Sequence, residues 1–368
     1  MGRIDRAMPS TAKTIRKISP VPGRDSVEGL DALFEYAGLR RSLRGKAGSR
    51  PVGAQPDRKT PEELNRPAPE PAIAANGVEW LPVPGWEKYK WLRVGFSTRR
   101  GGLSHAYCAE EAPGELNLGF TADDSHEAVA GNRRLLAEAV MGSADTPIVP
   151  LKQIHSNLVR LSASEDAGRA LPWKADGHFT AEQGVLLAVM TADCIPVLVA
   201  DRRQKAVAGF HAGWRGTVKR IVELGVGRMR LEFGSRPEDL IAAIGPGVGP
   251  CCYAVGEEVR GEFESQFAYA AELFHEVYDS DPVRTKYPML FLTQRAPGHS
   301  EIGPSQHLDL IEANRRQLLD AGLRPGAIQL IGGCTNCRMD LFFSHRASNG
   351  RAGRMMAVIG IAPAVVRR

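Results

Sequence analysis

Short runs of apolar residues separated by Gly and Pro turns fill the chain from Trp80 onward, and longer stretches with helical spacing alternate with them. Residues 185–200, VLLAVMTADCIPVLVA, predict a buried strand that is broken near 192–196. Apolar positions three or four residues apart predict an amphipathic helix over 217–233. The other expected elements are strands at 205–211, 240–244, 328–331 and 356–361, and helices at 256–274 and 308–322, the last ending at Gly322. The alternation favours an α+β fold, a single mixed α/β domain around a buried sheet.

The first 78 residues differ in composition and periodicity from the rest of the chain and predict a poorly ordered leader. This leaves 79–368 as the folded domain. Segment 42–76 is rich in Pro, Gly, Arg and Ala and shows little periodicity. Residues 30–39 are an exception, because their apolar spacing is that of a short helix that could dock on the domain. We assign the leader no function.

The charge distribution gives no reason to expect binding to nucleic acid or to an acidic membrane. Residues 1–75 hold 14 Lys/Arg against 9 Asp/Glu and the rest of the chain holds 33 of each, so the net charge of +5 belongs to the leader. No stretch approaches the roughly 20 apolar residues of a membrane span, and no signal-peptide pattern is visible. Six cysteines are too few for a disulfide scaffold. We expect a cytoplasmic protein with reduced thiols, and we take it to be a monomer.

Three segments place a metal-binding side chain in an apolar or glycine-rich setting. They surround His155 in QIHS, Cys194 in TADCIP and His211 in HAGWRG. Thiolate and imidazole ligands suit zinc, with copper as the alternative. Three protein ligands leave a fourth position open, where a bound water would become an attacking group for hydrolytic deamination. The competing interpretation is a small core cysteine beside an inert, hydrogen-bonded histidine.

The spacing of the last two candidates predicts that they face each other. If the polar break after Ala200 is a hairpin turn and Ala200 pairs with Lys205, Cys194 lies directly opposite His211. The Cβ atoms of directly opposed residues lie about 4.5–5.5 Å apart, which suits two ligands of one metal ion. A bulge at Pro196 would shift this register.

The sequence around these residues resembles that of the multicopper polyphenol oxidase, or laccase-domain, family. This family is now better described as zinc-dependent purine nucleoside phosphorylase and adenosine deaminase enzymes. The matching stretches follow in order from about residue 93 to the C-terminus, and HAGWRG is distinctive even alone. They are GFSTRRGG at 95–102, LNLG at 116–119, QIHS at 153–156, ADG at 175–177, MTADC at 190–194, HAGWRG at 211–216, IGPGVGPCCY at 244–253 and CTNC at 334–337.

The resemblance implies that His155, Cys194 and His211 are the metal ligands and that residues 79–368 form the catalytic domain. It implies a layered α/β/β/α sandwich, similar to the fold of deamidating bacterial toxins that use a Cys/His pair. It also implies phosphorolysis of adenosine, inosine, guanosine and methylthioadenosine, together with deamination of adenosine. Purine nucleosides and phosphate are therefore the expected partners, and zinc or copper is the expected cofactor.

Five further residues of these motifs are candidates for the site. Arg99 and Arg215 could bind phosphate, because Arg suits bidentate contact with an oxyanion, and Asn117 could hold a sugar or phosphate oxygen. Asp176 and Asp193 could orient a histidine ligand or move protons, and they form the catalytic set with Arg215. Each also has a structural interpretation: an ion pair for either Arg, a turn cap for Asp176 and a structural hydrogen bond for Asp193.

The cysteines outside this set carry a weaker signal. Cys334 and Cys337 have zinc-knuckle spacing, but no second pair lies near them in sequence, so we do not expect a structural zinc. Cys251 and Cys252 are interpreted as buried thiols. Near the C-terminus, FFSHRA at 342–347 departs from the FFSYRR pattern of the family, which puts a substrate contact by this segment in doubt.

Other functions remain open at this point. A copper-dependent polyphenol oxidase needs many histidine ligands, which are hard to find among nine scattered histidines. A cysteine hydrolase or amidase, with Cys194 as nucleophile and His211 as its base, would fit the proposed role of the family in editing peptidoglycan precursors. A non-enzymatic interaction module would be favoured only if no metal bound.

Overall fold

Two six-stranded sheets form the centre of the fold, which a computed structural model describes for residues 60–109, 111–169, 171–277 and 305–364. The first sheet has the strand order β1-β2-β3-β15-β8-β5 and the second β14-β11-β9-β10-β7-β6. The first consists of β1 (Ala72–Ile73), β2 (Glu79–Leu81), β3 (Leu92–Ser97), β15 (Met355–Ile361), β8 (Leu186–Thr191) and β5 (Ile148–Val149). The second consists of β14 (Ile328–Leu330), β11 (Leu240–Ile244), β9 (Ile195–Asp201), β10 (Ala206–Ala212), β7 (Gly177–Thr180) and β6 (Val159–Leu161).

Helices and short elements complete the described part of the chain. A separate two-stranded sheet pairs β12 (Phe274–Val277) with β13 (Ser305–Leu308). The α-helices are α2 (Pro61–Leu64), α3 (His126–Met141), α4 (Trp214–Val218), α5 (Ile221–Phe233), α6 (Glu257–Gln266) and α9 (Leu310–Asp320). Short 3-10 helices span Ser164–Gly168, Pro237–Asp239, Ala270–Leu273 and Pro325–Ala327, and β4 spans Arg100–Ser104.

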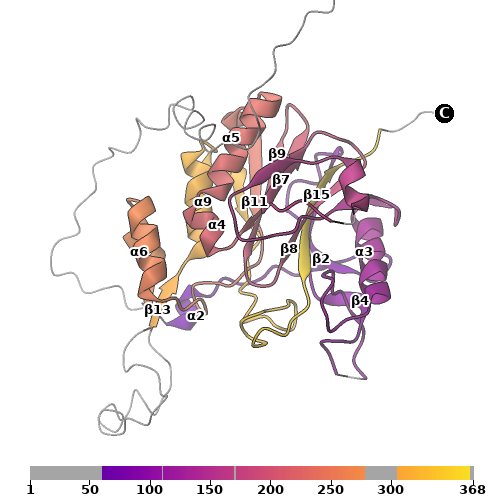
Figure 1. The fold of residues 1–368 in the computed structure, drawn as a ribbon, viewed down its shortest axis with the longest axis horizontal. Coiled ribbons are helices and arrows are strands. Elements are labelled where there is room, and N and C mark those ends of the chain that lie inside the picture. The colour runs from indigo at the N-terminus through magenta and orange to yellow at the C-terminus, as the bar shows by residue number, and fades with distance from the viewer. Residues whose placement is uncertain (1–59, 110, 170, 278–304, 365–368) are drawn as a thin grey trace, which may run out of the picture. The chain divides into compact units, whose positions relative to one another are not determined.

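Alternating side chains along the strands show that the two sheets pack face to face. In β8, Leu187 and Val189 belong to the core between the sheets, whereas Leu186 and Ala188 belong to a separate core beneath α3. This alternation follows from the two-residue period of a strand, which sends successive side chains to opposite faces. The first sheet is therefore covered by α3 on one face and by the second sheet on the other (Figure 1).

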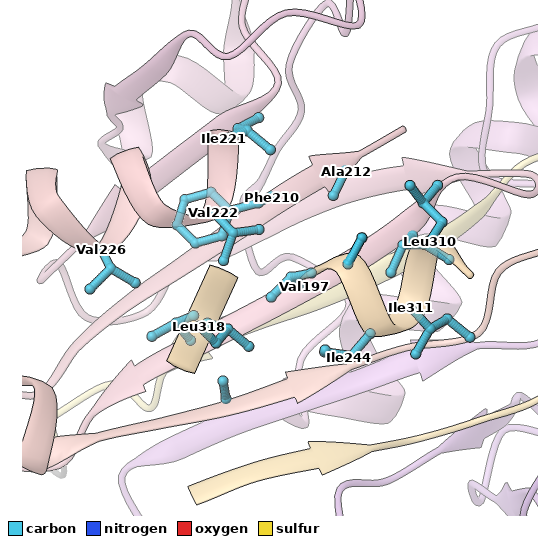
Figure 2. Close-up of a cluster of buried hydrophobic side chains, with 14 of the residues drawn as sticks. Val197, Phe210, Ala212, Ile221, Val222, Val226, Ile244, Leu310, Ile311 and Leu318 are labelled. Atoms are coloured by element: carbon cyan, nitrogen blue, oxygen red, sulfur yellow. The ribbon is translucent and has the colours of Figure 1, made fainter. Parts of the chain in front are cut away.

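The second sheet has the same arrangement with different helices. In β9, Leu198 and Ala200 face the first sheet, whereas Val197 and Val199 join the largest core, which packs against α5 and α9. Figure 2 shows this core, with side chains of α5 and α9 gathered over β9, β10 and β11. The layers therefore run helix, sheet, sheet, helix, and the expected α/β/β/α sandwich in a single mixed α/β domain is confirmed.

The sequence predicted the strands β8 to β11, β14 and β15 and the helices near α5, α6 and α9, but it did not predict β1 to β7, β12, β13 or the long helix α3. The apolar run 185–200 is two strands, β8 and β9, and the break between them falls at Ala192–Cys194. The helix predicted over 217–233 is instead two helices, because Arg220 adopts a left-handed conformation, with φ of 60°, between α4 and α5. The helix predicted over 256–274 ends at Gln266 and is followed by a 3-10 turn and β12.

The structure also describes part of the predicted leader. Residues 60–78 contain α2 and β1, and β1 pairs with β2 through Ala72 and Trp80. Thr60 caps α2, and the Arg66 guanidinium donates to Asp309 at the start of α9. These residues therefore form part of the folded structure. The short helix expected at residues 30–39 lies outside the described residues.

The predicted register of the β9–β10 hairpin was wrong by one step on each strand. Asp201, not Ala200, ends β9, and it pairs with Ala206, so His211 lies opposite Pro196 and not opposite Cys194. The reason is the turn. The Asp201 carboxylate accepts from the backbone N–H groups of Arg203 and Gln204, which closes a four-residue loop.

Two glycines of α5 allow a matched test of the core. A Cβ at Gly225 would overlap the ring of Phe210 on β10, whereas a Cβ at Gly227 would meet nothing within 4 Å. We expect Gly225→Ala to lower the free energy of unfolding by about 1–3 kcal/mol, because the core is already filled. Gly227→Ala should raise it by up to about 1 kcal/mol through helix propensity. Chemical denaturation of both variants checks this, and equal effects would contradict the packing.

Candidate metal centre

The structure brings the three predicted metal ligands together at one end of the sandwich. His155 comes from the loop between β5 and β6, Cys194 from the crossing between β8 and β9, and His211 from β10. Their ligand atoms all lie within 4.8 Å of one another. The Cys194 Sγ is 3.8 Å from His155 Nε2, and the two imidazole rings meet edge to face at 4.9 Å.

The Asp176 carboxylate contacts the His211 ring and the backbone of the loop that carries His155. Its buried carboxylate lies 2.9 Å from His211 Nδ1, which leaves Nε2 of that ring as the metal-binding atom. It also accepts from the backbone N–H groups of Ile154, His155 and Ser156 at 2.6–3.2 Å, so the whole QIHS loop closes on this carboxylate. A carboxylate bound to the ring of a ligand histidine fixes the orientation and the basicity of that ring, here His211, and the same carboxylate holds the backbone at His155.

Two residues of the site have left-handed backbone conformations. His155 has φ of 57° and Asp193, next to Cys194, has φ of 93°. Non-glycine residues rarely adopt this region, and such strain persists only where the surroundings impose it. For His155 the surroundings are the three N–H bonds to Asp176. For Asp193 they are a hydrogen bond from Thr335 and another from the Arg346 backbone N–H.

The backbone at Gly213 passes so close to two of the ligand side chains that this position favours a glycine. A Cβ at Gly213 would lie 2.9 Å from Cys194 Sγ and 3.1 Å from His155 Cδ2. Gly213 is therefore the position that faces Cys194 across the hairpin, and the absence of a side chain leaves room for both ligands. This contact, and not the direct pairing expected from the sequence, brings Cys194 within reach of His211.

The electrostatics of the cluster favour the thiolate form of Cys194, the protonated form of His211 and the carboxylate form of Asp176. Burial alone would raise the pKa of Cys194, but the nearby His211 and a hydrogen bond to His155 lower it to about 6. Burial alone would lower the pKa of His211, but Cys194 and the hydrogen bond to Asp176 raise it to about 9. Burial is outweighed at Asp176 as well, where bonds to His211 and Ser156 lower the pKa to about 2.

These shifts predict the pH at which the Cys194 thiol reacts. In protein stripped of metal, the thiolate should persist from high pH down to about 6, because the folded pKa is depressed from its usual 9.0. We expect the alkylation rate of Cys194 to be half-maximal near pH 6 and to fall as the pH drops further, since the thiolate is the nucleophile. Mass spectrometry of iodoacetamide-treated protein measures this, with Cys194→Ser as the control. A midpoint near 9 would contradict the arrangement.

Asp193 holds the loops behind Cys194 together. Its two carboxylate oxygens accept from Thr335 Oγ1 at 2.6 Å and from the Arg346 N–H at 2.7 Å, and its backbone oxygen accepts from Val248 N–H at 2.7 Å. These bonds occupy both oxygens and favour a positioning role. Sequence reasoning missed Thr335 and Arg346, which lie more than 140 residues from Asp193.

The remaining candidates differ in how free their polar groups are. Arg215 is exposed at the start of α4 and its guanidinium lies 4.4 Å from the centre of the Trp214 ring. Tyr253 lies close to Arg215 and Cys194. Burial and the charge of Cys194 raise the pKa of its phenol, while the charges of Arg346 and Arg215 oppose that rise. Two arginines and Cys194 therefore lie around this phenol.

Arg99 and Asn117 have structural partners. Arg99 pairs with Glu115 at 2.6 Å, donates to the backbone oxygens of Met339 and Tyr107, and lines a cavity of about 270 Å³. The Asn117 amide donates to Gly119 and Asp124 and accepts from the N–H groups of Gly119 and Arg354. A substrate contact by Asn117 would require breaking one of these bonds.

A second group of side chains that could hold a metal ion consists of the four cysteines whose spacing led us to expect no structural zinc. Cys251, Cys252, Cys334 and Cys337 lie together, with all four sulfurs within 4.8 Å of one another. The sequence separates the two pairs by more than 80 residues, so the spacing gave no sign that they meet. Of the four, Cys251 and Cys334 are buried, Cys252 is partly exposed and Cys337 is exposed.

The donor set of the first cluster fits a metal site with an open position. Two imidazoles and one thiolate suit zinc and also copper, and three protein ligands leave room for a substrate atom. Among the described residues, no helix is long and apolar enough to cross a membrane.

Comparison with known proteins agrees with this picture. The family described as multi-copper polyphenol oxidoreductase laccase matches residues 93–362. The chain belongs to this family, as its motifs predicted. It is 38% identical over 266 residues to a purine nucleoside phosphorylase of Deinococcus radiodurans, covering 72% of this chain and 88% of the relative. It is 33% identical over 270 residues to one of Bacteroides thetaiotaomicron, covering 72% and 90%.

A solved structure supports the fold as well. The chain resembles the crystal structure of YlmD from Geobacillus stearothermophilus with a TM-score of 0.62 and 31% identity, covering 81% of this chain and all of the other. The resemblance to the purine nucleoside phosphorylases named above supports an enzyme of that type.

Proposed function

We propose that this protein is a zinc-dependent purine nucleoside phosphorylase that also deaminates adenosine, with His155, Cys194 and His211 as the zinc ligands. The observation that carries the proposal is the cluster of these three ligand atoms within 4.8 Å, with one buried aspartate holding the His155 loop and the His211 ring. The names of relatives that share this family support the reaction class.

In phosphorolysis a phosphate oxygen forms a bond to C1′ of the ribose while the bond from C1′ to the purine nitrogen breaks and the base takes up a proton. The zinc, when bound, would supply Lewis-acid polarisation of a substrate atom at its open position. Arg215 is suited to hold the phosphate, because its guanidinium is exposed beside the cluster and Arg binds oxyanions in a bidentate manner. Asp176 keeps His211 Nδ1 engaged, which orients that ring, and it holds the backbone of the loop that carries His155.

The expected substrates are adenosine, inosine, guanosine and methylthioadenosine with phosphate, and adenosine with water for deamination. Hydrolytic deamination replaces the amino group at C6 of adenine by an oxygen from water and releases ammonia. Both reactions need one electrophilic centre and one oriented nucleophile, which a single three-ligand site can provide.

A cysteine hydrolase or amidase, acting for example on peptidoglycan precursors, is the second candidate. The observation that favours it is a Cys194 thiol with a pKa of about 6 beside His211, which in turn contacts Asp176. A Cys, His and Asp in this relation are suited to nucleophilic catalysis. Bound metal separates the two, because a ligand cysteine needs stoichiometric metal and a nucleophile does not.

Copper-dependent polyphenol oxidation fits the side chains less well. Among the described residues, groups of three or more potential ligands occur twice, and only one of these groups contains histidine. Multicopper oxidation requires several histidine-rich copper centres. The histidine-containing group therefore favours single-metal chemistry.

The test is to purify the full chain without chelators or tag-borne metal, and to measure bound metal together with adenosine and inosine turnover with and without phosphate. We expect stoichiometric zinc and phosphate-dependent release of free base. Arg215→Met should raise the KM for phosphate more than the KM for nucleoside, with the exposed Arg230→Met of α5 as the matched control. A protein without metal at this cluster that leaves nucleosides unchanged would refute the proposal and favour Cys194 as a nucleophile.

A further inference from the structure

Four cysteines meet beside the first cluster because of how two strands pair. Cys251 and Cys252 follow β11, and Cys334 and Cys337 follow β14. These strands are parallel neighbours, with Ile244 opposite Leu330, so the chain leaves both at the same edge of the sheet. The segments remain bonded beyond the strands, where the Thr335 N–H donates to the Gly247 oxygen at 3.0 Å.

The sulfur positions match the geometry of one tetrahedral ion. All four lie within 4.8 Å of one another, and Cys337 Sγ is 3.6 Å from Cys251 Sγ and 3.4 Å from Cys252 Sγ. Four sulfurs at a Zn–S distance of about 2.3 Å stand about 3.8 Å apart at the corners of a tetrahedron. A disulfide needs a separation of about 2.05 Å, and all four cysteines are free thiols.

The local backbone is shaped to turn neighbouring cysteines toward one point. In an extended strand Cys251 and Cys252 would face opposite sides. Here they lie in a turn, because the N–H groups of Cys252 and Tyr253 both donate to the Gly249 oxygen at 3.0 Å. The Gly249 N–H donates to Cys334 Sγ at 3.2 Å, a bond that stabilises a thiolate.

The cluster lies in a part of the molecule with few apolar contacts of its own. Its apolar neighbours form a small group made of Leu64 from α2, Val248, Val277 and partly Tyr253. Four chain segments without long helices or strands meet there. A bound ion would supply the cohesion that such a small apolar group lacks.

We propose that Cys251, Cys252, Cys334 and Cys337 bind one Zn²⁺ in an all-thiolate structural site, distinct from the centre formed by His155, Cys194 and His211. Four protein ligands fill a tetrahedral zinc and leave no position for a substrate. Soft thiolates select zinc over magnesium or calcium.

This site supports the first centre through a short path. Thr335, directly after Cys334, donates to Asp193, and the Val248 N–H donates to the backbone oxygen of Asp193. Asp193 directly precedes Cys194. The ion therefore joins the two segments that hold the strained backbone behind a ligand of the other centre.

The test separates the two sites by substitution. The full chain carrying His155→Ala, Cys194→Ser and His211→Ala keeps only the four-cysteine site, and we expect it to retain about one zinc per chain. After replacement by Co²⁺ it should show the intense visible absorption of a tetrahedral thiolate site. Adding Cys334→Ser and Cys337→Ser should remove this zinc, whereas adding Cys108→Ser, which changes a cysteine outside both clusters, should leave it.

Two outcomes would overturn the proposal. One is a folded triple variant without zinc, and the other is an intact mass lower by two hydrogens, which indicates a disulfide. If the triple variant does not fold, X-ray absorption of the native zinc protein decides the question. Sulfur ligands should outnumber nitrogen ligands if both sites are filled, and nitrogen ligands should outnumber sulfur if only the His155 cluster holds zinc.

Discussion

His211→Ala should abolish phosphorolysis and release the zinc bound at His155 and Cys194. His211 is 4% exposed, and its Nδ1 atom contacts Asp176, so no neighbouring side chain can take over as ligand. Loss of one of three protein ligands leaves too few to hold the ion. Bound zinc measured per chain, and the initial rate of base release from inosine with phosphate, check this result.

His126→Ala provides the matched control, because His126 is exposed on α3 and is not part of either metal-binding group. It should keep both zinc and activity. If the four-cysteine site is filled, His211→Ala should lose about one of two zinc ions and not both. Full phosphorolysis by His211→Ala would contradict the assignment of the centre.

Asp176→Asn should have the second largest effect, on metal affinity and on stability together. The carboxylate contacts His211 and accepts from three successive N–H groups of the QIHS loop. In the Asn variant the NH2 group of the amide would face some of these N–H donors and could not accept from them. We expect zinc affinity to fall about 10–100-fold, as for other groups that orient ligand histidines. The free energy of unfolding should fall by about 3–5 kcal/mol, because a buried charged network is broken.

Chelator competition and chemical denaturation measure the two effects. Asp145→Asn, which removes a largely exposed partner of Arg134, should change stability by less than about 1 kcal/mol. The pKa of Asp176 falls from 3.8 to about 2 on folding, so its contribution to stability should be complete above pH 3.8 and decline as the pH falls toward 2. A variant that binds zinc like the native protein would show that Asp176 does not orient the ligands.

Local patterns predicted the elements but not every boundary between them. The apolar run 185–200 predicted a buried strand broken near 192–196, because strands covered on both faces have few polar positions, and the structure shows two strands there. The helix over 217–233 was predicted as one, because apolar spacing does not register the left-handed residue Arg220 that divides it. The hairpin register failed because Asp201 belongs to β9 and its side chain closes the loop that follows, so the four-residue loop begins one residue later than the apolar pattern implied.

The candidate ligands were named mainly through their motifs. Distinctive sequence motifs contain His155, Cys194 and His211. In the structure the ligand atoms of these three residues lie within 4.8 Å of one another. Their support was harder to predict. Asp176 had been proposed to orient a histidine ligand or to move protons, with a turn cap as the alternative, and its carboxylate contacts the His211 ring and also closes the QIHS loop. Thr335 lies within the CTNC stretch, but nothing in the sequence indicated that its hydroxyl donates to Asp193.

The sequence by itself determined the family, the mixed α/β class, the strands β8 to β11, β14 and β15, the helices that pack on the second sheet, and the three side chains proposed to bind metal. These depend on periodicity and on short motifs, which are local properties of the chain. Only the tertiary structure decided which loops meet. The parallel pairing of β11 with β14 gathers four cysteines from distant segments, and the β9–β10 register places Gly213, not His211, across from Cys194. Both results depend on strand order and register, which are set by long-range packing and turn geometry rather than by the residues on either side of each ligand.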